Sequence, residues 1–337
     1  ANGSSPETIK SIKYNAPRDY TSQDRAVTAD DYKVLVKSLY ANAQSVQVYG
    51  GEDAATPDYG KVYISIKAKS GSNLTEVTKT SLVQSLKSYA VASVTPVIID
   101  PETTFITLTT TFKYDSSLTT KDVSTLQTNV LNAVSTYNTD TLEDFTGMFR
   151  YSAVGKTIDE ADTSILSNIT KIKMYKYITP TLSSGLKYTL SFNNAFYNPH
   201  SGHNASAGGI VSSTGFKIND DSSTNEHFLD DNGEGAIRVY YLSGTTRIYT
   251  DSSFGTIDYT TGEIILTSAN ITSISNVDGA ASTQIRVTVT PSSNDVVPVR
   301  NQVLSIDTAN SSFTGSVDEI ESGSSQAGTT YTTTSSY

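Results

Sequence analysis

The local fold of this chain is clearest in residues 17–67, which read PRDYTSQDRAVTADDYKVLVKSLYANAQSVQVYGGEDAATPDYGKVYISIK. Thr28 and Asp31 have the spacing of a capping box, in which each side chain accepts a hydrogen bond from the backbone of the other residue at a helix start. Apolar residues then recur at Tyr32, Leu35, Val36 and Leu39. This spacing predicts a helix with one apolar face.

Two strands are predicted directly after this helix. Val46 and Val48 alternate with polar neighbours, and Pro57 and Gly60 then mark a turn. Beyond the turn, apolar side chains occupy every second position, at Val62, Ile64, Ile66 and Ala68. A period of two places alternate side chains on opposite faces, so this run is predicted to be a strand.

The rest of the first half repeats these two patterns. Helical spacing recurs at 75–91 and 120–137, and strand alternation recurs at 106–114 and 171–178. Helices that alternate with strand pairs suggest helices packed on one face of a mixed sheet. We therefore expect an α+β fold, with an α+β unit over residues 1–178.

The second half of the sequence has a different pattern. From residue 179 to residue 306 no helical period is found, while strand alternation recurs with turn signals such as Ser243-Gly244. This predicts a mainly antiparallel β module over 179–306. Residues 307–337 are poor in bulky apolar side chains and rich in Ser, Thr and Gly, so they are predicted to form a flexible tail.

Composition argues against several classes of function. The net charge of −10 disfavours nucleic acid as a partner, because phosphate contacts need clustered Lys and Arg. The 337 residues include no Cys, which excludes disulfides and thiolate chemistry. No apolar run reaches the roughly 18 residues of a membrane span. The chain starts at Ala1 without a signal-peptide pattern, and we expect a fragment or a processed product.

Histidines give the one motif of metal-binding type. His200-x-x-His203, with His227 further on, has residues that bind Zn or Ni. The first two lie in a loop rich in Gly and Asn, which lacks the fixed geometry of a helix or strand. We expect a solvated loop and no metal.

Other candidate motifs are incomplete. Residues 230–234 (DDNGE) suggest a calcium loop, but Phe228 and Val239 stand where acidic ligands are required, which favours a turn. Gly155-Lys156-Thr157 resembles the end of a phosphate loop, but Arg150 replaces its first glycine. We therefore expect no catalytic residue and no cofactor.

Four aromatic residues are candidates for contact with a partner protein, namely Phe196, Tyr197, Tyr240 and Tyr241. Interfaces concentrate binding energy in Tyr and similar residues. Tyr240 and Tyr241 are adjacent in a predicted strand, so one of them must face the core. We predict these four residues as the interface set.

The helix start Thr28-Ala29-Asp30-Asp31-Tyr32 and the turn and strand at 57–66 resemble the baseplate J-like family, which includes the baseplate wedge proteins of contractile-tailed phages. In that family a T-A-x-D-Y helix start precedes a short strand and a P-x-x-G-x-V strand. With its β-rich second half, the chain is most similar to the C-terminal part of the inner-ring wedge subunit of T-even-like phages.

The resemblance implies a structural virion protein of the tail baseplate, assembled in the host cytoplasm and without enzymatic activity. It also implies homodimeric contacts that link wedges into an inner ring, contacts with other wedge proteins, and rearrangement when the sheath contracts. It implies no membrane partner and no cofactor.

Two other functions stay open. A receptor-binding or fibre adhesin suits Tyr-rich loops and β modules, although a helical first half is untypical of repetitive fibres. A tail-associated hydrolase would need a pair of carboxylates in a cleft, and the spacing of such a pair in space cannot be read from sequence.

Overall fold

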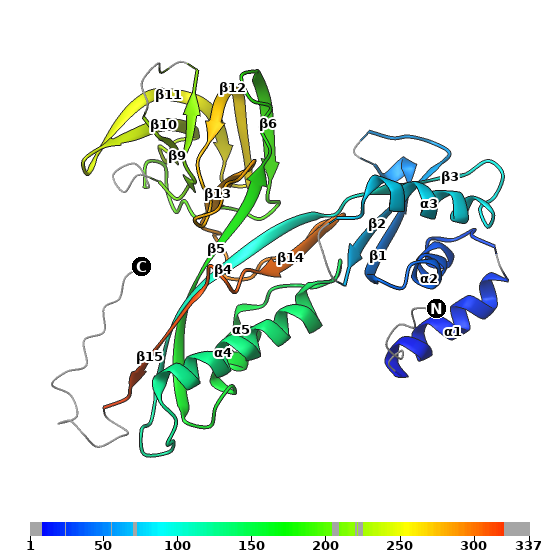
Figure 1. Cartoon of the computed structure of the whole chain (residues 1–337), viewed down its shortest axis with the longest axis horizontal. Helices are drawn as coiled ribbons and strands as arrows, with labels where there is room; N and C mark the ends of the chain where they lie inside the picture. The colour runs from blue at the N-terminus through cyan, green and yellow to red at the C-terminus, as the bar shows by residue number, and fades with distance from the viewer. Residues whose placement is uncertain are drawn as a thin grey trace. The chain divides into compact units, whose positions relative to one another are not determined.

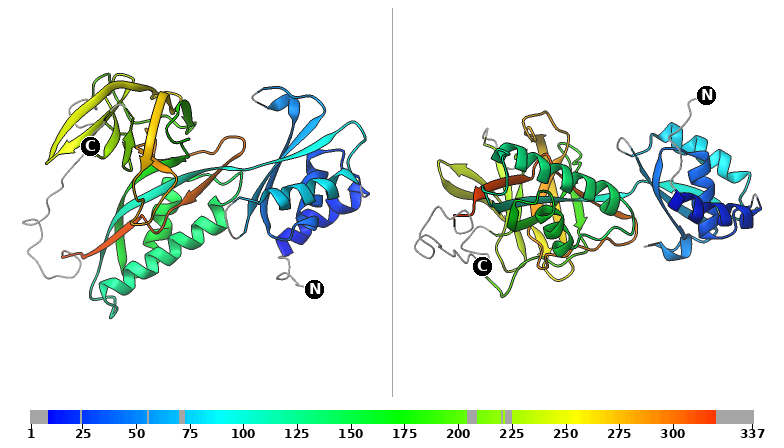
Figure 2. Two further views of the ribbon diagram at one scale, coloured as in Figure 1. Left: turned by 45° about the horizontal axis from the view of Figure 1, so that its top comes forward. Right: turned by 90° about the horizontal axis from the view of Figure 1, so that it is seen from below.

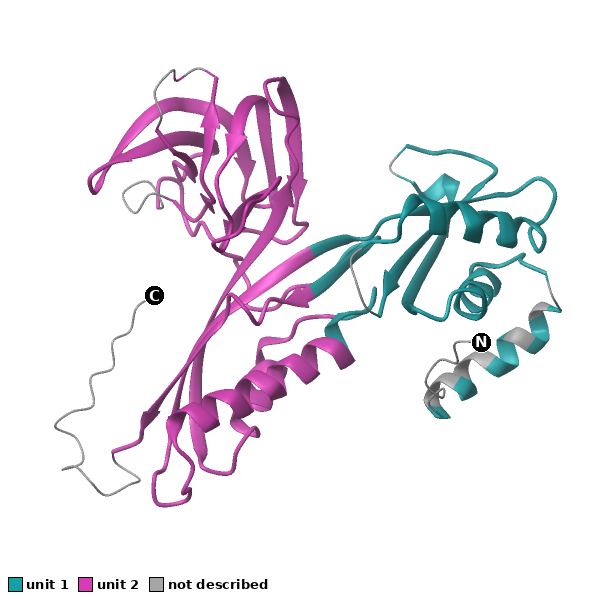
Figure 3. Ribbon diagram, in the orientation of Figure 1, with its two compact units in different colours: residues 1–103, 141–147, 298–304 teal, residues 104–140, 148–297, 305–337 magenta. Residues whose placement is uncertain are grey.

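The computed structural model describes residues 9–23, 25–54, 56–69, 73–203, 209–219, 221 and 225–319. The chain divides into two compact units (Figure 3). Unit 1 comprises Ala1–Thr103, Thr141–Gly147 and Pro298–Leu304, and unit 2 comprises Thr104–Asp140, Met148–Val297 and Ser305–Tyr337. Within the described ranges, no helix has the length and apolar character needed to cross a membrane.

Unit 1 combines a three-stranded sheet with helices (Figure 1). In the sheet, β1 (Ala43–Gly50) is antiparallel to β2 (Lys61–Ala68), and β2 is parallel to β3 (Thr95–Ile99). The helices are α1 (Ile9–Ser22), α2 (Ala29–Leu39) and α3 (Glu76–Lys87), with the short 3-10 helix η1 (Gly51–Asp53) after β1. One core unites the unit and includes Tyr32, Val36, Val46, Ile64, Leu82 and Leu86.

The predicted start of α2 is confirmed. The Thr28 hydroxyl accepts a hydrogen bond from the Asp31 backbone N–H at 3.3 Å, and the Asp31 carboxylate accepts one from the Thr28 N–H at 2.8 Å. Tyr32, Leu35 and Val36 are buried, as the apolar face predicts. The capping box thus fixes where the helix begins, and the core fixes which way it faces.

A six-stranded sheet is built around the antiparallel pair β4 (Glu102–Tyr114) and β5 (Ile165–Ile178). The pair β13 (Ile285–Val289) and β7 (Ser212–Ser213) extends the sheet beyond β5, while β14 (Gln302–Ile306) and β15 (Ser312–Val317) both pair with β4. Figure 2 shows α4 (Val123–Tyr137) and α5 (Tyr151–Asp159) beside these strands. The π-helix η2 (Asn138–Leu142) follows α4.

The other sheet of unit 2 is an antiparallel barrel. Its strands are β6 (Gly185–Ser191), β8 (Phe216–Ile218), β9 (His227–Asp231), β10 (Ala236–Ser243), β11 (Thr246–Asp258) and β12 (Glu263–Ile274). They follow the order β11-β10-β9-β8-β12-β6, and the additional pairing of β11 with β12 closes five of them into a ring. Buried side chains such as Leu229, Val239, Ile257 and Leu266 fill it.

The prediction of an α+β fold with helices packed on a mixed sheet is wrong. The chain is mostly β, with a barrel and sheets and comparatively few helices. Hydrophobic periodicity detects an element from its own residues, but it does not show which distant strands pair with it. The strands β13, β14 and β15, from the end of the described chain, complete the sheet around β4 and β5.

Part of the segment that was predicted to be a flexible tail forms a strand. Residues 312–317 form β15, which pairs in parallel with β4, so that Ser312 is opposite Thr109 and Val317 is opposite Tyr114. Backbone hydrogen bonding to an existing strand stabilises a segment that has few apolar side chains of its own. The part of the predicted tail over residues 320–337 lies outside the described residues, and the division at residues 178 and 306 stays a prediction.

Candidate functional site

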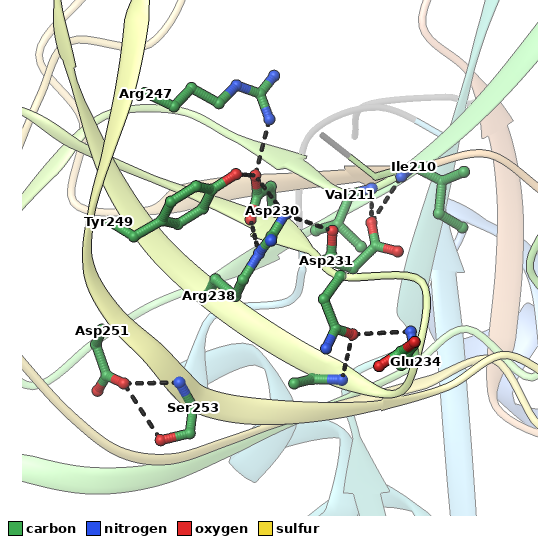
Figure 4. Close-up of polar contacts among 12 residues, drawn as sticks. Ile210, Val211, Asp230, Asp231, Glu234, Arg238, Arg247, Tyr249, Asp251 and Ser253 are labelled. Carbon is green, nitrogen blue, oxygen red and sulfur yellow. Dashed lines mark hydrogen bonds and ion pairs between the residues drawn. The ribbon is translucent and has the colours of Figure 1, made fainter. Parts of the chain in front are cut away.

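A cluster of buried charges lies at the end of β9, where Asp230 and Asp231 are almost fully buried (Figure 4). One oxygen of Asp230 accepts a hydrogen bond from Arg238 Nε at 2.9 Å. The other accepts from Arg247 Nη1 and from the Tyr249 hydroxyl, each at 2.8 Å. Both oxygens are therefore paired, which is the condition under which a protein tolerates a buried carboxylate.

The same two arginines stack on tyrosine rings. The Arg238 guanidinium lies 4.3 Å from the centroid of the Tyr249 ring, and that of Arg247 lies 4.6 Å from the centroid of the Tyr240 ring. Cation–π attraction of this kind adds to the ion pairs. Burial raises the pKa of Tyr240 and of Tyr249, so both phenols stay neutral. Side chains thus join β9, β10 and β11 in addition to the backbone ladder.

The Asp231 side chain anchors a loop, whereas that of Asp230 links strands. Its Oδ1 accepts hydrogen bonds from the backbone N–H groups of Ile210 and Val211 at 2.6 and 2.9 Å, and its Oδ2 accepts one from the Tyr259 hydroxyl at 2.6 Å. Gly209 has φ of +78°, and a Cβ there would collide with the Asp231 carboxylate. The loop before β7 is therefore pinned to the end of β9 at a position that requires glycine.

Residues 232–235 connect β9 to β10, whereas the sequence predicted a turn over 230–234, of which Asp230 and Asp231 belong to β9. Asn232 Oδ1 accepts hydrogen bonds from the backbone N–H groups of Glu234 and Ala236 at 2.8 and 3.0 Å. Gly233 and Gly235 both have positive φ, which suits a tight reversal between β9 and β10. The carboxylate oxygens of Asp230 and Asp231 in this segment are bonded to other groups of the protein.

The charge cluster is therefore structural in its chemistry, because each carboxylate already has protein partners. Sequence reasoning missed its arginines, since cross-strand register decides which side chains meet. A signal was present, however. The tripeptides Arg238-Val-Tyr240 and Arg247-Ile-Tyr249 repeat in two successive strands, and an Arg-x-Tyr pattern on paired strands is a means of stacking cations on rings.

The four predicted interface residues differ in burial: two are buried and two are half-buried. Phe196 is 2% exposed and packs edge-on against Phe192, and Tyr240 is 8% exposed within the charge cluster. Tyr240 is thus the inward-facing member of its pair. Tyr197 and Tyr241 are half-buried, with their rings against His203 and His227 respectively. An interface role for these residues stays a prediction.

The histidines lie in two places. His200 and His203 share a turn, where His203 Nδ1 is 3.2 Å from His200 Nε2. His227 is 1% exposed, and its Nε2 is 3.1 Å from an Asp221 carboxylate oxygen. In the part of the chain that the structure describes, no group of three or more His, Cys, Asp or Glu side chains is placed to hold a metal ion.

Two family models match successive segments of the chain. The model for C-terminal domain I of the baseplate structural protein gp6 matches residues 28–99, and the model for its C-terminal domain III matches residues 102–177. Residues 28–177 are therefore similar, in two successive segments, to two C-terminal domains of one baseplate structural protein.

A relative and a solved structure are also similar. The chain is 30% identical over 220 residues to the baseplate wedge protein gp6 of Enterobacteria phage T4, which covers 59% of this chain. The chain spans about a third (32%) of the length of that protein. The cryo-EM structure of the anti-feeding prophage baseplate is 13% identical with a TM-score of 0.35, and the match covers 51% of this chain and 39% of that one.

Proposed function

We propose that the whole protein is a structural subunit of a baseplate wedge and acts through contacts with other proteins instead of through catalysis. The observation that carries this proposal is the consecutive match to two C-terminal domains of one baseplate protein, at residues 28–99 and 102–177. The first match begins at the capped start of α2 and ends with β3. The second contains β4, α4 and α5 and ends one residue before β5 does.

Self-association is the second part of the proposal. Copies of the chain form homodimers that link wedges into an inner ring, and other wedge proteins bind the same subunit. A ring of this kind needs two distinct contact surfaces, one within a wedge and one between wedges. Stable contacts usually bury roughly 1,600 Å². Rearrangement during sheath contraction then requires that one of these contacts break while the other holds.

Sedimentation velocity over a range of concentrations tests self-association. The mass of the chain is 36.1 kDa, and we expect a species of twice this mass to increase with concentration. Tyr241→Ser is expected to weaken the dimer if Tyr241 contributes to the contact. Tyr59→Ser is a matched control, because Tyr59 is 81% exposed on unit 1. A stable trimer would instead favour a fibre adhesin, and a monomer that stays monomeric when mixed with the other wedge proteins would refute the proposal.

A further inference from the structure

Hydrogen bonds anchor the turn that carries His200 and His203 to two other segments, one after β13 and one between β9 and β10. The Tyr197 backbone N–H donates to the Thr290 carbonyl at 3.0 Å, and the Gly202 N–H donates to the Gly233 carbonyl at 3.0 Å. The Asn198 side-chain amide donates to the same Gly233 carbonyl at 3.1 Å. The two histidines therefore lie on an exposed loop whose backbone is anchored by hydrogen bonds.

The two imidazoles face each other through nitrogen atoms. His200 Nε2 and His203 Nδ1 are 3.2 Å apart, and the two rings are nearly perpendicular at 89°. A tetrahedral zinc ion with Zn–N bonds of about 2.0–2.1 Å holds two ligand nitrogens about 3.3–3.4 Å apart. The separation already present is thus close to the one that a shared cation requires.

The tautomer of His200 is set by a second contact. His200 Nδ1 lies 3.2 Å from the Ser201 carbonyl oxygen, which can only accept a hydrogen bond. Nδ1 therefore carries the proton, and the lone pair of His200 is on Nε2, the atom that faces His203. A histidine ligand typically donates its other N–H group to a backbone carbonyl in this way.

We propose that His200 and His203 form a two-histidine site for a divalent transition-metal ion of the class that imidazole binds, such as Zn²⁺, Ni²⁺ or Cu²⁺. Without metal, His203 Nδ1 donates to the lone pair of His200 Nε2. With metal, the proton of His203 moves to its own Nε2, and both facing nitrogens bind the ion while both rings stay neutral. Water fills the remaining coordination positions.

Neighbouring groups favour a cation at this place. A Glu234 carboxylate oxygen lies 3.7 Å from the position that a Cβ of Gly202 would occupy, so a negative charge stands beside the turn. The edge of the Tyr197 ring packs against His203, with centroids 5.6 Å apart, and restricts rotation of that imidazole. The third histidine of the chain is excluded from the site by its burial near Asp221.

Titration of the tag-free chain with ZnCl₂ and with NiCl₂, followed by calorimetry, tests the proposal. We expect saturation at one ion per chain, and a loss of affinity of at least about tenfold in His203→Ala and in His200→Gln. Ser201→Ala is the matched control, because it changes the same turn but keeps the carbonyl and both imidazoles. Melting curves of the variants confirm that each is folded.

Proton NMR of the imidazoles gives an independent readout, since the chain has three histidines. Paramagnetic Ni²⁺ should broaden the signals of His200 and His203 and leave that of His227 sharp. Absence of saturable binding, or binding that persists in both histidine variants, would overturn the proposal. Failure here would leave the wedge function untouched, because that function does not depend on a metal.

Discussion

Asp230 is one side chain that joins three strands, since it belongs to β9 and contacts Arg238 of β10 and both Arg247 and Tyr249 of β11. Its burial is possible only because these partners replace the water that the carboxylate loses. The neighbouring Asp231 plays the same part for the loop before β7. The barrel is therefore stabilised by a few buried charges in addition to its apolar core.

Asp230→Asn keeps the shape of this side chain and removes its charge. Two partly buried arginines then lose the ion pair with Asp230, and we expect a loss of about 2–4 kcal/mol in the free energy of unfolding. This is less than for a fully buried ion pair, because the Arg247 side chain is 36% exposed. Urea unfolding followed by tyrosine fluorescence measures it. Asp251→Asn is the control, because the Asp251 carboxylate bonds to Ser253 of its own strand and lies outside the charge cluster. Equal losses in the two variants would contradict the proposed role of Asp230.

Asp162 makes stability depend on pH. Lys121 Nζ, 2.5 Å from its carboxylate, lowers the pKa of Asp162 from 3.8 to about 2, with further help from the Ser164 backbone and hydroxyl. A carboxylate whose pKa is lower in the folded state stabilises the fold above its unfolded pKa, and this contribution is lost as pH falls from about 4 to about 2.

We therefore expect Asp162→Asn to cost about 1–2 kcal/mol at pH 7, a figure reduced from the full shift because Lys121 is 48% exposed. The difference from the parent chain should shrink as the pH falls toward 2. Denaturant titrations at neutral and acidic pH measure both values. A difference that stays constant over this pH range would show that Asp162 acts by packing alone.

At the scale of elements, β14 and β15 are attached to β4 in two steps. Between them, Asp307 accepts hydrogen bonds from the backbone N–H groups of Ala309 and Asn310 and from the Tyr175 hydroxyl. Ser311 then donates from its hydroxyl to the Asp307 carbonyl and accepts from the Leu108 N–H. These contacts turn the chain so that β15 continues along the same edge of β4.

Gly315 is the position that allows β15 to lie there. A Cβ at residue 315 would be 2.7 Å from the Phe112 ring and 2.8 Å from a Val123 methyl carbon. We expect Gly315→Val to displace β15 and to speed hydrogen exchange at the backbone of residues 312–317. Ser316→Val is the control, because Ser316 is exposed on the same strand. Unchanged protection in Gly315→Val, measured by mass spectrometry, would show that the strand is not held by this close contact.

These elements also show how far sequence reasoning reached. The capped helix α2 and the strands β1 and β2 were predicted because their signals are local, namely a cap and an alternation. The pairing of β15 with β4 joins residues about 200 positions apart, as in the contact of Ser311 with Leu108. Nothing in the periodicity of either strand specifies such a partner, so the mostly β architecture was missed.

The candidate sites also differ in whether they depend on local sequence signals or on long-range contacts. Tyr240 and Tyr241 were expected to face opposite ways, and Tyr240 is the one inside. The Asp230 cluster and the facing nitrogens of His200 and His203 depend on cross-strand register and loop anchoring, which become visible only in three dimensions. The sequence shows that these residue types are present, but it does not show which of them are in contact.

The whole molecule is proposed to be a component of a larger assembly. Two matched domains of one baseplate protein lie in succession over residues 28–177, and the chain spans about a third of the length of the phage T4 relative. Under the proposed function, the fold must stay stable while the contacts of the subunit with its neighbours change.

The proposed function places this chain in a baseplate. Gold-labelled antibodies raised against the purified chain, applied to purified contractile-tailed particles and viewed by electron microscopy, test it most directly. We predict label at the baseplate end of the tail, before and after contraction. Label along the tail fibres would contradict the proposed function. So would the absence of label, if mass spectrometry also finds no copy of the chain in disrupted tails.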